Sequence, residues 1–183
     1  MTEGRKRKRW DAILDRIPDD VPFTFVEVGV DRAITSRIVI ASRPKLTAFL
    51  VDPYKAGVPG TPWWKSGSVM PSRPQAMFDA AKRRAHEVIA PYRNRTTFYE
   101  MPSVEAAAML TGNLFDMVFI DGDHSYDGCL LDIQTWLPMV KTGGWICGHD
   151  YDKPERGQVT EAVLAVFPEG VEVDAESTWF KKI

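Results

Sequence analysis

The chain has 183 residues, of which 44% are hydrophobic and 26% are charged, and its formal net charge at pH 7 is −2. This length fits one domain, residues 1–183, which can bury a core without disulfides. The small net charge gives no general argument for a nucleic-acid surface, and no apolar stretch is long enough to span a bilayer. The two cysteines, Cys129 and Cys147, lack a metal-type spacing, so we expect them to be reduced and buried in a cytoplasmic protein.

The chain begins with a basic run, "RKRKR" at residues 5–9, which is followed by apolar residues at helical spacing from Trp10 to Ile17. This spacing predicts an amphipathic helix that ends near Pro18 and lies in an N-terminal extension over residues 1–20. We interpret the basic run as the solvated start of this helix rather than as a nucleic-acid or membrane contact.

Short apolar runs alternate with longer helical patterns through the middle of the chain. Parallel strands need crossover helices, and strands covered on both faces are continuously apolar, so this alternation predicts a doubly wound α/β layer. The expected strands are residues 23–28, 46–51, 96–99, 117–120 and 144–147. The expected helices are residues 33–42, 75–89, 104–110 and 128–140.

The C-terminal part of the chain follows a different pattern. A helix over residues 159–167 precedes two short strands, 171–174 and 177–183, with a turn-like segment between them. Two strands joined without a helix predict an antiparallel hairpin at the edge of the sheet. The sheet is therefore expected to be mostly parallel, with about seven strands in all.

One long segment, residues 52–74, has no period and is rich in Pro and Gly. Loops of this length inside compact domains are uncommon and are usually functional or disordered. The adjacent Trp63 and Trp64 would be costly on a purely solvated loop, which favours a lid or a substrate wall over residues 53–74. The alternative is a loop packed against its own face of the sheet.

Polar residues follow the first two strands, at the sheet edge where open α/β proteins bind ligands. Glu27, Gly29 and Asp31 lie at the first turn, which has one glycine and lacks the G-x-G-x-x-G pattern of a dinucleotide site, so NAD is disfavoured. Asp52 ends the second strand, where this architecture places a carboxylate on ribose hydroxyls. The alternative is a turn or N-cap aspartate before Pro53.

Residues after the later strands complete the candidate site. Ser103 is expected to cap the helix after the third strand, with Glu105 in its first turn. The fourth strand ends in "DGDH" (121–124) and the fifth in "GHD" (148–150). If these strands are neighbours, their acids and histidines converge and can bind a hard cation or supply a general base. The alternative role of Asp123 is to hold its loop by accepting backbone N–H groups.

Taken together, these features resemble the class I S-adenosylmethionine-dependent methyltransferases, and most closely the methyltransferase domain 24 family. That family is characterised by a strand ending in I-D-G-D-H-x-Y, a helix with D-x-x-x-W, and an L-x-P-G-G turn before a strand ending in G-H-D-Y. The matching residues are Asp121, Gly122, Asp123, His124, Tyr126, Asp132, Trp136, Gly143, Gly144 and Gly148 to Tyr151. The likeness covers residues 23–183 and is strongest over 115–151.

The resemblance implies a Rossmann-like fold and a single methyltransferase domain that uses S-adenosyl-L-methionine to methylate oxygen on a small molecule or sugar. The implied cofactor-binding residues are Glu27, Gly29, Asp31, Asp52, Ser103 and Asp121. The implied catalytic residues are Asp121, His124 and His149. The implied ligands of Mg²⁺ or another divalent cation are Asp121, His149 and Asp150, although Mg²⁺ prefers oxygen to imidazole nitrogen. Ala33 stands where a later glycine is common in the family.

Two other classes of function are alternatives at this point. A cofactor-binding module would bind S-adenosylmethionine without turnover, and a metal-dependent hydrolase or lyase would use the same sheet edge without responding to that cofactor. The expected partner is a small-molecule acceptor, with neither nucleic acid nor membrane involved. Because no separate substrate domain is evident, the pocket is expected to be closed by the 52–74 loop, by the N-terminal helix, or by a second subunit in a homo-oligomer.

Overall fold

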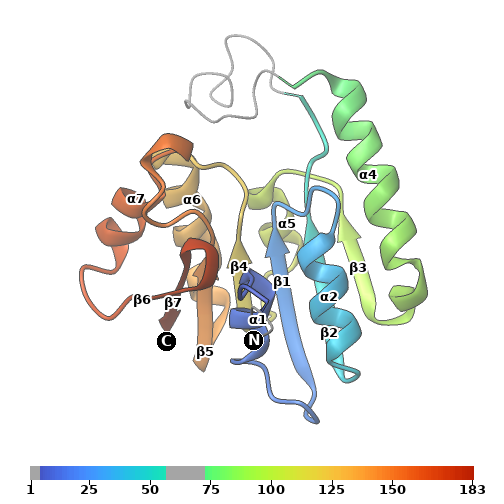
Figure 1. The fold of residues 1–183 in the computed structure, drawn as a ribbon, viewed down its shortest axis with the longest axis horizontal. Coiled ribbons are helices and arrows are strands. Elements are labelled where there is room, and N and C mark those ends of the chain that lie inside the picture. Colours follow the sequence, from blue (N-terminus) through green and yellow to red (C-terminus); the bar gives the residue numbers. More distant parts are fainter. Residues whose placement is uncertain (1–4, 57–72) are drawn as a thin grey trace.

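The structure, a computed structural model, describes residues 5–56 and 73–183, and its sheet has seven strands in the order β3-β2-β1-β4-β5-β7-β6 (Figure 1). The strands are β1 (Phe23–Val28), β2 (Leu46–Val51), β3 (Thr96–Tyr99), β4 (Phe115–Ile120), β5 (Val140–Gly148), β6 (Glu172–Asp174) and β7 (Thr178–Lys182). The α-helices are α1 (Arg9–Leu14), α2 (Ile34–Ser42), α4 (Gln75–Ile89), α5 (Ser103–Met109), α6 (Tyr126–Trp136) and α7 (Val159–Val166). Short 3₁₀ helices are η1 (Ala90–Arg95), η2 (Leu137–Met139), η3 (Pro154–Arg156) and η4 (Ala175–Ser177).

The direction of winding reverses at β1. This strand pairs in parallel with both β2 and β4, and β3 and β5 then pair in parallel on the outer sides of β2 and β4. The chain therefore builds the sheet outward from β1 in one direction, returns, and builds it in the other. The predicted doubly wound parallel sheet is confirmed, and ligands of such sheets bind in the crevice at the reversal point.

The C-terminal hairpin is also confirmed, and its second strand lies inward. β7 pairs antiparallel with β5 and with β6, which leaves the three-residue β6 at the edge. The "AES" segment is the 3₁₀ turn η4, in which Glu176 and Ser177 have positive φ values of 55° and 61°. Tyr151 N donates to the carbonyl of Ser177 at 3.0 Å, so this turn lies beside the carboxyl end of β5.

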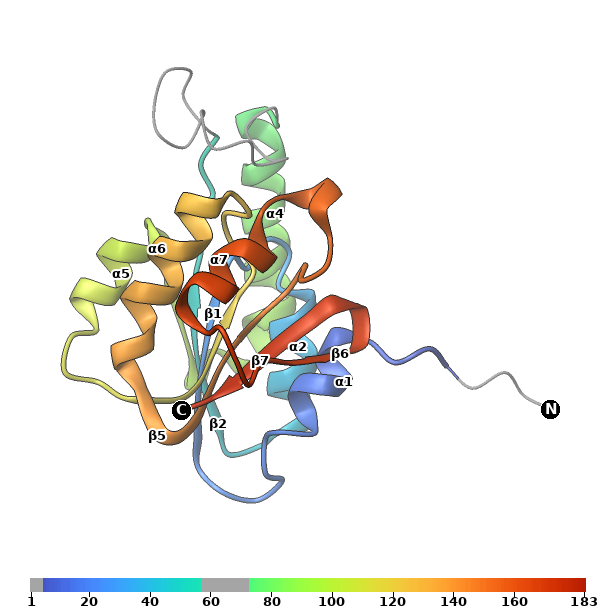
Figure 2. The same cartoon turned by 90° about the vertical axis from the view of Figure 1, so that its left-hand side faces the viewer.

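Helices lie on both faces of the sheet (Figure 2), and one apolar cluster lies on each face. One joins α1, α2 and α4 to strand residues such as Phe25, and the other joins α5, α6 and α7 to residues such as Val26. Successive strand residues point to opposite faces, so a strand buried on both sides must be apolar throughout. The cysteines, Cys129 and Cys147, lie one in each cluster and are buried and free, as predicted.

Some element boundaries differ from the sequence prediction. The helix predicted over 128–140 is α6, which begins earlier because Ser125 Oγ accepts the N–H of Gly128 at 3.1 Å. It ends at Trp136, before Pro138, whose ring cannot continue an α-helix. The first helix ends at Leu14, and single turns carry the chain on to Ile17.

The predicted lid over residues 53–74 is described only at its two ends, since Trp63 and Trp64 fall outside the described residues. Among the described residues, every helix is too short or too polar to cross a membrane.

Candidate active site

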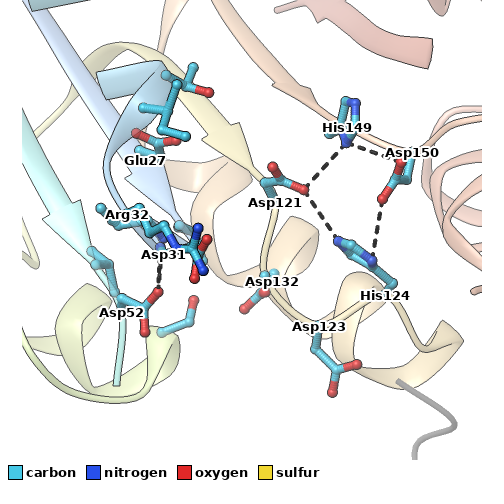
Figure 3. A pocket seen from close by; sticks show the side chains of 18 of the residues that line it. Glu27, Asp31, Arg32, Asp52, Asp121, Asp123, His124, Asp132, His149 and Asp150 are labelled. Atoms are coloured by element: carbon cyan, nitrogen blue, oxygen red, sulfur yellow. Dashed lines mark hydrogen bonds and ion pairs between the residues drawn. The ribbon is translucent and has the colours of Figure 1, made fainter. Parts of the chain in front are cut away.

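A pocket of about 700 Å³ lies at the carboxyl ends of β1, β2, β4 and β5 (Figure 3), a volume suited to a cofactor-sized ligand. All the residues predicted to bind the cofactor line it: Glu27, Gly29, Asp31, Asp52, Ser103 and Asp121. The predicted catalytic and metal-ligating residues His124, His149 and Asp150 line it as well. The sheet therefore brings all these residues into one cavity, which leaves their individual roles as predictions.

The loop after β1 has a left-handed backbone at two residues that are not glycine. Asp31 has φ 46° and Ala33 has φ 54°, a conformation that costs L-residues about 1–2 kcal/mol. Ala33 N donates to the carbonyl of Val30 at 2.8 Å, and Ala33 is the N-cap of α2. The family's glycine at this position would adopt the conformation without strain, and here the fully buried Ala33 methyl group packs in the core instead.

Asp52 ties the loop after β1 to the end of β2. Its Oδ2 accepts the backbone N–H groups of Val30 at 3.0 Å and Asp31 at 2.9 Å, and its Oδ1 accepts that of Tyr54 at 2.7 Å. The hydrogen bond from Tyr54 shows that Asp52 has the turn role considered as the alternative. Asp52 also lines the pocket, so the two roles are compatible. Burial raises the pKa of Asp52, and the three N–H donors oppose the rise.

Glu27 brings a carboxyl group to the pocket without a full set of partners. The residue is 2% exposed, and its Oε2 has no hydrogen-bond partner among the described residues. Burial raises the pKa of Glu27 well above its ordinary value, and the charge of Asp121 raises it further. An ammonium or another hydrogen-bond donor on a ligand would satisfy this oxygen.

Ser103 is not the N-cap that the sequence predicted. Pro102 is the N-cap of α5, and Ser103 is the first residue of the helix. The buried Oγ of Ser103 accepts the indole N–H of Trp136 at 2.8 Å and hydrogen-bonds Asp132. Asp132 and Trp136 are one turn apart on α6, so the D-x-x-x-W pattern holds α6 against the start of α5. Burial raises the pKa of Asp132 to about 7, although the Ser103 hydrogen bond opposes the shift.

Four side chains after β4 and β5 form a closed ring (Figure 3). His124 Nε2 lies 3.3 Å from Asp121 Oδ1, and His124 Nδ1 lies 3.4 Å from Asp150 Oδ2. On the opposite side, His149 Nδ1 lies 3.1 Å from Asp150 Oδ1 and 3.6 Å from Asp121 Oδ1. Each imidazole therefore lies between the same two carboxylates.

The charges of the ring decide which groups carry protons. Burial alone would lower the pKa of His149, but hydrogen bonds to Asp121 and Asp150 raise it to about 9. The pKa of His124 is also raised, because Asp121 outweighs the effect of burial. Burial would raise the pKa of Asp121, and the two histidines and Arg9 reverse this and hold it low. At pH 7 His149 is therefore protonated in the protein alone, and a protonated imidazole is an acid rather than a base.

The same ring has the donors of a cation site. One ligand atom each from Asp121, His124 and Asp150 lie within 4.8 Å of one another. Asp150 is 3% exposed, and its Oδ2 has no hydrogen-bond partner among the described residues. Adjacent ligands at about 2.1 Å from one ion are about 3 Å apart, close to the separations in the ring. The predicted ligand His149 contacts the same carboxylates, so which imidazole would bind a cation stays a prediction.

Sequence reasoning placed some residues correctly and missed others. Asp123 holds its loop, as considered, because its Oδ1 accepts the backbone N–H of Ser125 at 2.9 Å. Two residues that line the pocket, Arg9 and Glu176, were not considered as site residues. No local motif marks them: Arg9 belongs to the basic run and Glu176 to a turn about 170 positions later.

Comparisons with known proteins agree with this arrangement. The chain resembles solved structures of the calicheamicin methyltransferase CalS11 (TM-score 0.68, 13% identity, covering 94% of this chain and 76% of that one). It also resembles the O-methyltransferase NovP (TM-score 0.63, 18% identity, 95% and 78%). An apo structure of CalS11, described as a TDP-rhamnose 3'-O-methyltransferase, has a TM-score of 0.62 at 15% identity and covers 94% and 77%.

These structures share the fold at low sequence identity, and the search of curated protein sequences found no match to the chain. The family comparison is more specific, because residues 26–151 match the methyltransferase domain family. The matched segment covers more than half of the chain and runs from β1 to the residue that follows the ring. The chain belongs to the methyltransferase domain family.

Proposed function

We propose that the protein is an S-adenosyl-L-methionine-dependent methyltransferase that methylates an oxygen atom of a small molecule or sugar, assisted by a divalent cation. The observation that carries the proposal is the pocket at the winding reversal, which brings the Asp121–His124 ring together with Glu27, whose Oε2 has no hydrogen-bond partner among the described residues. Membership of the methyltransferase domain family supports the reaction class. CalS11 and NovP are O-methyltransferases, which supports an oxygen acceptor.

The half of the pocket near β1 and β2 suits the cofactor. When bound, S-adenosylmethionine supplies an activated methyl group on a positively charged sulfur. Glu27 Oε2 is buried and has no hydrogen-bond partner among the described residues, which supports a role in accepting hydrogen bonds from the ammonium of the methionine part. Asp52 is fixed by three backbone N–H groups, and its remaining lone pair, on Oδ1, is available to a ribose hydroxyl.

The ring at the carboxyl ends of β4 and β5 suits the acceptor. A hydroxyl group is a weak nucleophile until a base removes its proton. His124 and His149 are within reach of this end of the pocket, but each must be neutral to accept that proton. A cation bound near Asp121 and Asp150 would repel the positive charge of a protonated imidazole. It would therefore favour the neutral forms of His124 and His149.

A divalent cation would supply this positive charge and could also polarise the acceptor oxygen. The residues that would hold it are Asp121 and Asp150, with an imidazole from His124 or His149. Asp150 Oδ2 faces His124 but forms no hydrogen bond with any described residue, which supports a cation at this position. The remaining contribution of the chain is positioning, which can lower a barrier by about 7–11 kcal/mol when the reacting atoms are well aligned.

Ligand binding and methyl transfer test the proposal separately. Titration calorimetry should show that the protein binds S-adenosylhomocysteine and does not bind NAD. Glu27→Gln should weaken the binding of S-adenosylhomocysteine. Radiolabelled S-adenosylmethionine should then transfer label to members of a panel of phenols, catechols and nucleotide sugars. Binding without transfer to any acceptor would favour the binding module, and metal-dependent turnover without the cofactor would favour a hydrolase or lyase.

A further inference from the structure

Arg9 reaches the candidate active site from outside the segment that matches the family, which begins at residue 26. It is the first residue of α1, and its side chain is 25% exposed. Its Nη1 donates to Asp121 Oδ2 at 2.6 Å, and the residue lines the same pocket as His149. The family match therefore assigns no role to this contact.

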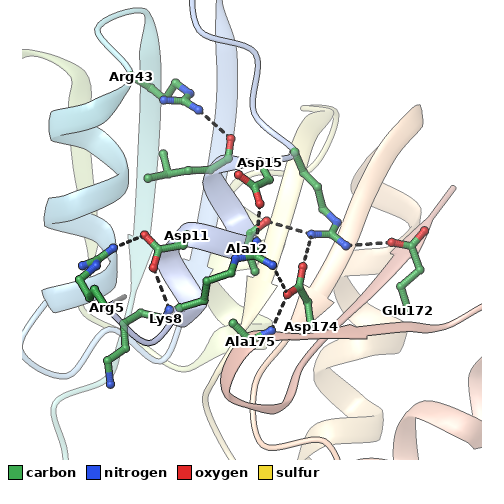
Figure 4. A network of polar contacts seen from close by, with 12 residues as sticks. Arg5, Lys8, Asp11, Ala12, Asp15, Arg43, Glu172, Asp174 and Ala175 are labelled. Atoms are coloured by element: carbon green, nitrogen blue, oxygen red, sulfur yellow. Dashed lines mark hydrogen bonds and ion pairs between the residues drawn. The ribbon is translucent and has the colours of Figure 1, made fainter. Parts of the chain in front are cut away.

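Contacts with the C-terminal turn η4 hold Arg9 in place. Glu176 accepts the backbone N–H of Arg9 at 3.2 Å and the Nζ of Lys8 at 2.7 Å. Asp174, the last residue of β6, pairs with Arg7 at 2.8 Å and with Arg16 at 3.3 Å (Figure 4). Three residues of the basic run, Arg7, Lys8 and Arg9, therefore contact acids that come from the other end of the chain.

The two oxygens of Asp121 face different partners. Oδ1 faces the imidazoles of the ring, at 3.3 Å from His124 and 3.6 Å from His149. Oδ2 accepts the guanidinium of Arg9. A divalent cation bound by Asp121 would share one carboxylate with this guanidinium, and the low exposure of the pair limits screening by water. Two positive charges on one carboxylate oppose each other.

We propose that Arg9 is a positioning residue that holds Asp121 in the cation-free protein and competes with a divalent cation for it. This inference rests on the cation site of the proposed function. Binding couplings are reciprocal: if Arg9 weakens cation binding by some factor, the cation weakens the hold of Arg9 on Asp121 by the same factor. Cation binding therefore loosens α1, and with it the wall of the pocket formed by Arg9 and Trp10.

Manganese binding to the full chain tests the competition without an acceptor. Electron paramagnetic resonance counts free Mn²⁺, and Arg9→Met should bind Mn²⁺ about tenfold more tightly than the wild type, a factor that corresponds to 1.4 kcal/mol. Arg9→Lys, which keeps the charge, should stay within about threefold of the wild type. The matched control is Arg5→Met, because Arg5 belongs to the same basic run and pairs with Asp11 away from the pocket; its affinity should not change.

Hydrogen exchange tests the reciprocal effect in the unmodified protein. Saturating Mn²⁺ should speed amide exchange over residues 9–17 in the wild type and have no such effect in Arg9→Met. Three outcomes would each overturn the inference. Arg9→Met could bind Mn²⁺ no more tightly than the wild type, neither protein could bind Mn²⁺, or amide exchange could fail to respond to Mn²⁺. Binding of S-adenosylhomocysteine in the same samples reports on the methyltransferase function independently of these outcomes.

Discussion

The Cα of Gly29 lies directly against the backbone of Asp121: a Cβ atom built on Gly29 would be 2.2 Å from the carbonyl oxygen of Asp121. The two residues follow β1 and β4, the neighbouring strands at the winding reversal. Asp121 N also donates to the carbonyl of Val28 at 2.7 Å. The loops that carry the two halves of the pocket are thus joined through their backbones, and a side chain on Gly29 would separate them.

We predict that Gly29→Ala is strongly destabilising and abolishes binding of S-adenosylhomocysteine. The expected loss in the free energy of unfolding is more than about 3 kcal/mol, because the new methyl group collides with backbone that cannot move away alone. Gly112→Ala is a matched control, since Gly112 has a similar φ of +90° but nothing within 4 Å of its Cβ position. Urea denaturation should show a loss of about 1 kcal/mol for the control. Equal losses in the two variants would contradict the close-approach argument.

Asp52 is predicted to act in both cofactor binding and loop structure. Asp52→Asn keeps one acceptor oxygen for the N–H groups of Val30 and Asp31 but turns an amide NH₂ toward the N–H of Tyr54, so affinity for S-adenosylhomocysteine should fall about tenfold with a moderate fall in melting temperature. Asp52→Ala should weaken binding further and lower the melting temperature, because three backbone N–H groups lose their acceptor. Asp19→Asn, at a site 87% exposed, is the control. Unchanged affinity in Asp52→Ala would remove the ribose assignment.

Stability should depend on pH through Asp132. Its folded-state pKa of about 7 exceeds the ordinary value of 3.8, so the folded protein keeps a proton that the unfolded chain releases between these values. The stabilisation is complete below pH 3.8 and is lost as the pH rises to about 7. Because each pKa unit corresponds to about 1.4 kcal/mol, the loss amounts to a few kcal/mol.

Urea denaturation of Asp132→Asn across this pH range checks the assignment. The variant keeps a hydrogen-bonding group for Ser103 but cannot ionise, so its stability should vary less with pH than that of the wild type. Asp127→Asn, at an exposed position of the same helix, should follow the wild-type curve. Parallel curves for Asp132→Asn and the wild type would exclude Asp132 as the source of the pH dependence.

The donor set predicts which cations bind. Imidazole nitrogen suits cobalt, zinc and other transition-metal ions, whereas Mg²⁺ prefers oxygen ligands. The protein should therefore bind Co²⁺ more tightly than Mg²⁺, and His124→Asp should lower this preference at least tenfold. His86→Asp is the control, since His86 lies on the surface of α4, stacked on Phe98 and bonded to Glu100. The visible spectrum of bound Co²⁺ and competition with Mg²⁺ measure the ratio. Tighter Mg²⁺ binding by the wild type would contradict the prediction.

Much of the fold could be predicted from the sequence, because local patterns determine it. Short, largely apolar runs such as residues 23–28 identify strands covered on both faces, and β1 has these bounds. The helix over 75–89 follows from its periodicity and from the prolines around it. The predicted capping role of Ser103 was wrong, because a serine beside a helix start favours capping locally, whereas the indole of Trp136 reaches it from a helix more than twenty residues away.

The sequence by itself determined which chemical groups follow each strand, since a strand's end and its polar residues are adjacent in the chain. Only the tertiary structure decided how Asp121, His124, His149 and Asp150 share their charges, because the ring exists only after β4 and β5 pair. Arg9 and Glu176 enter the site from opposite ends of the chain. No local pattern encodes such a contact, because it depends on the packing of α1 and η4 against the completed sheet.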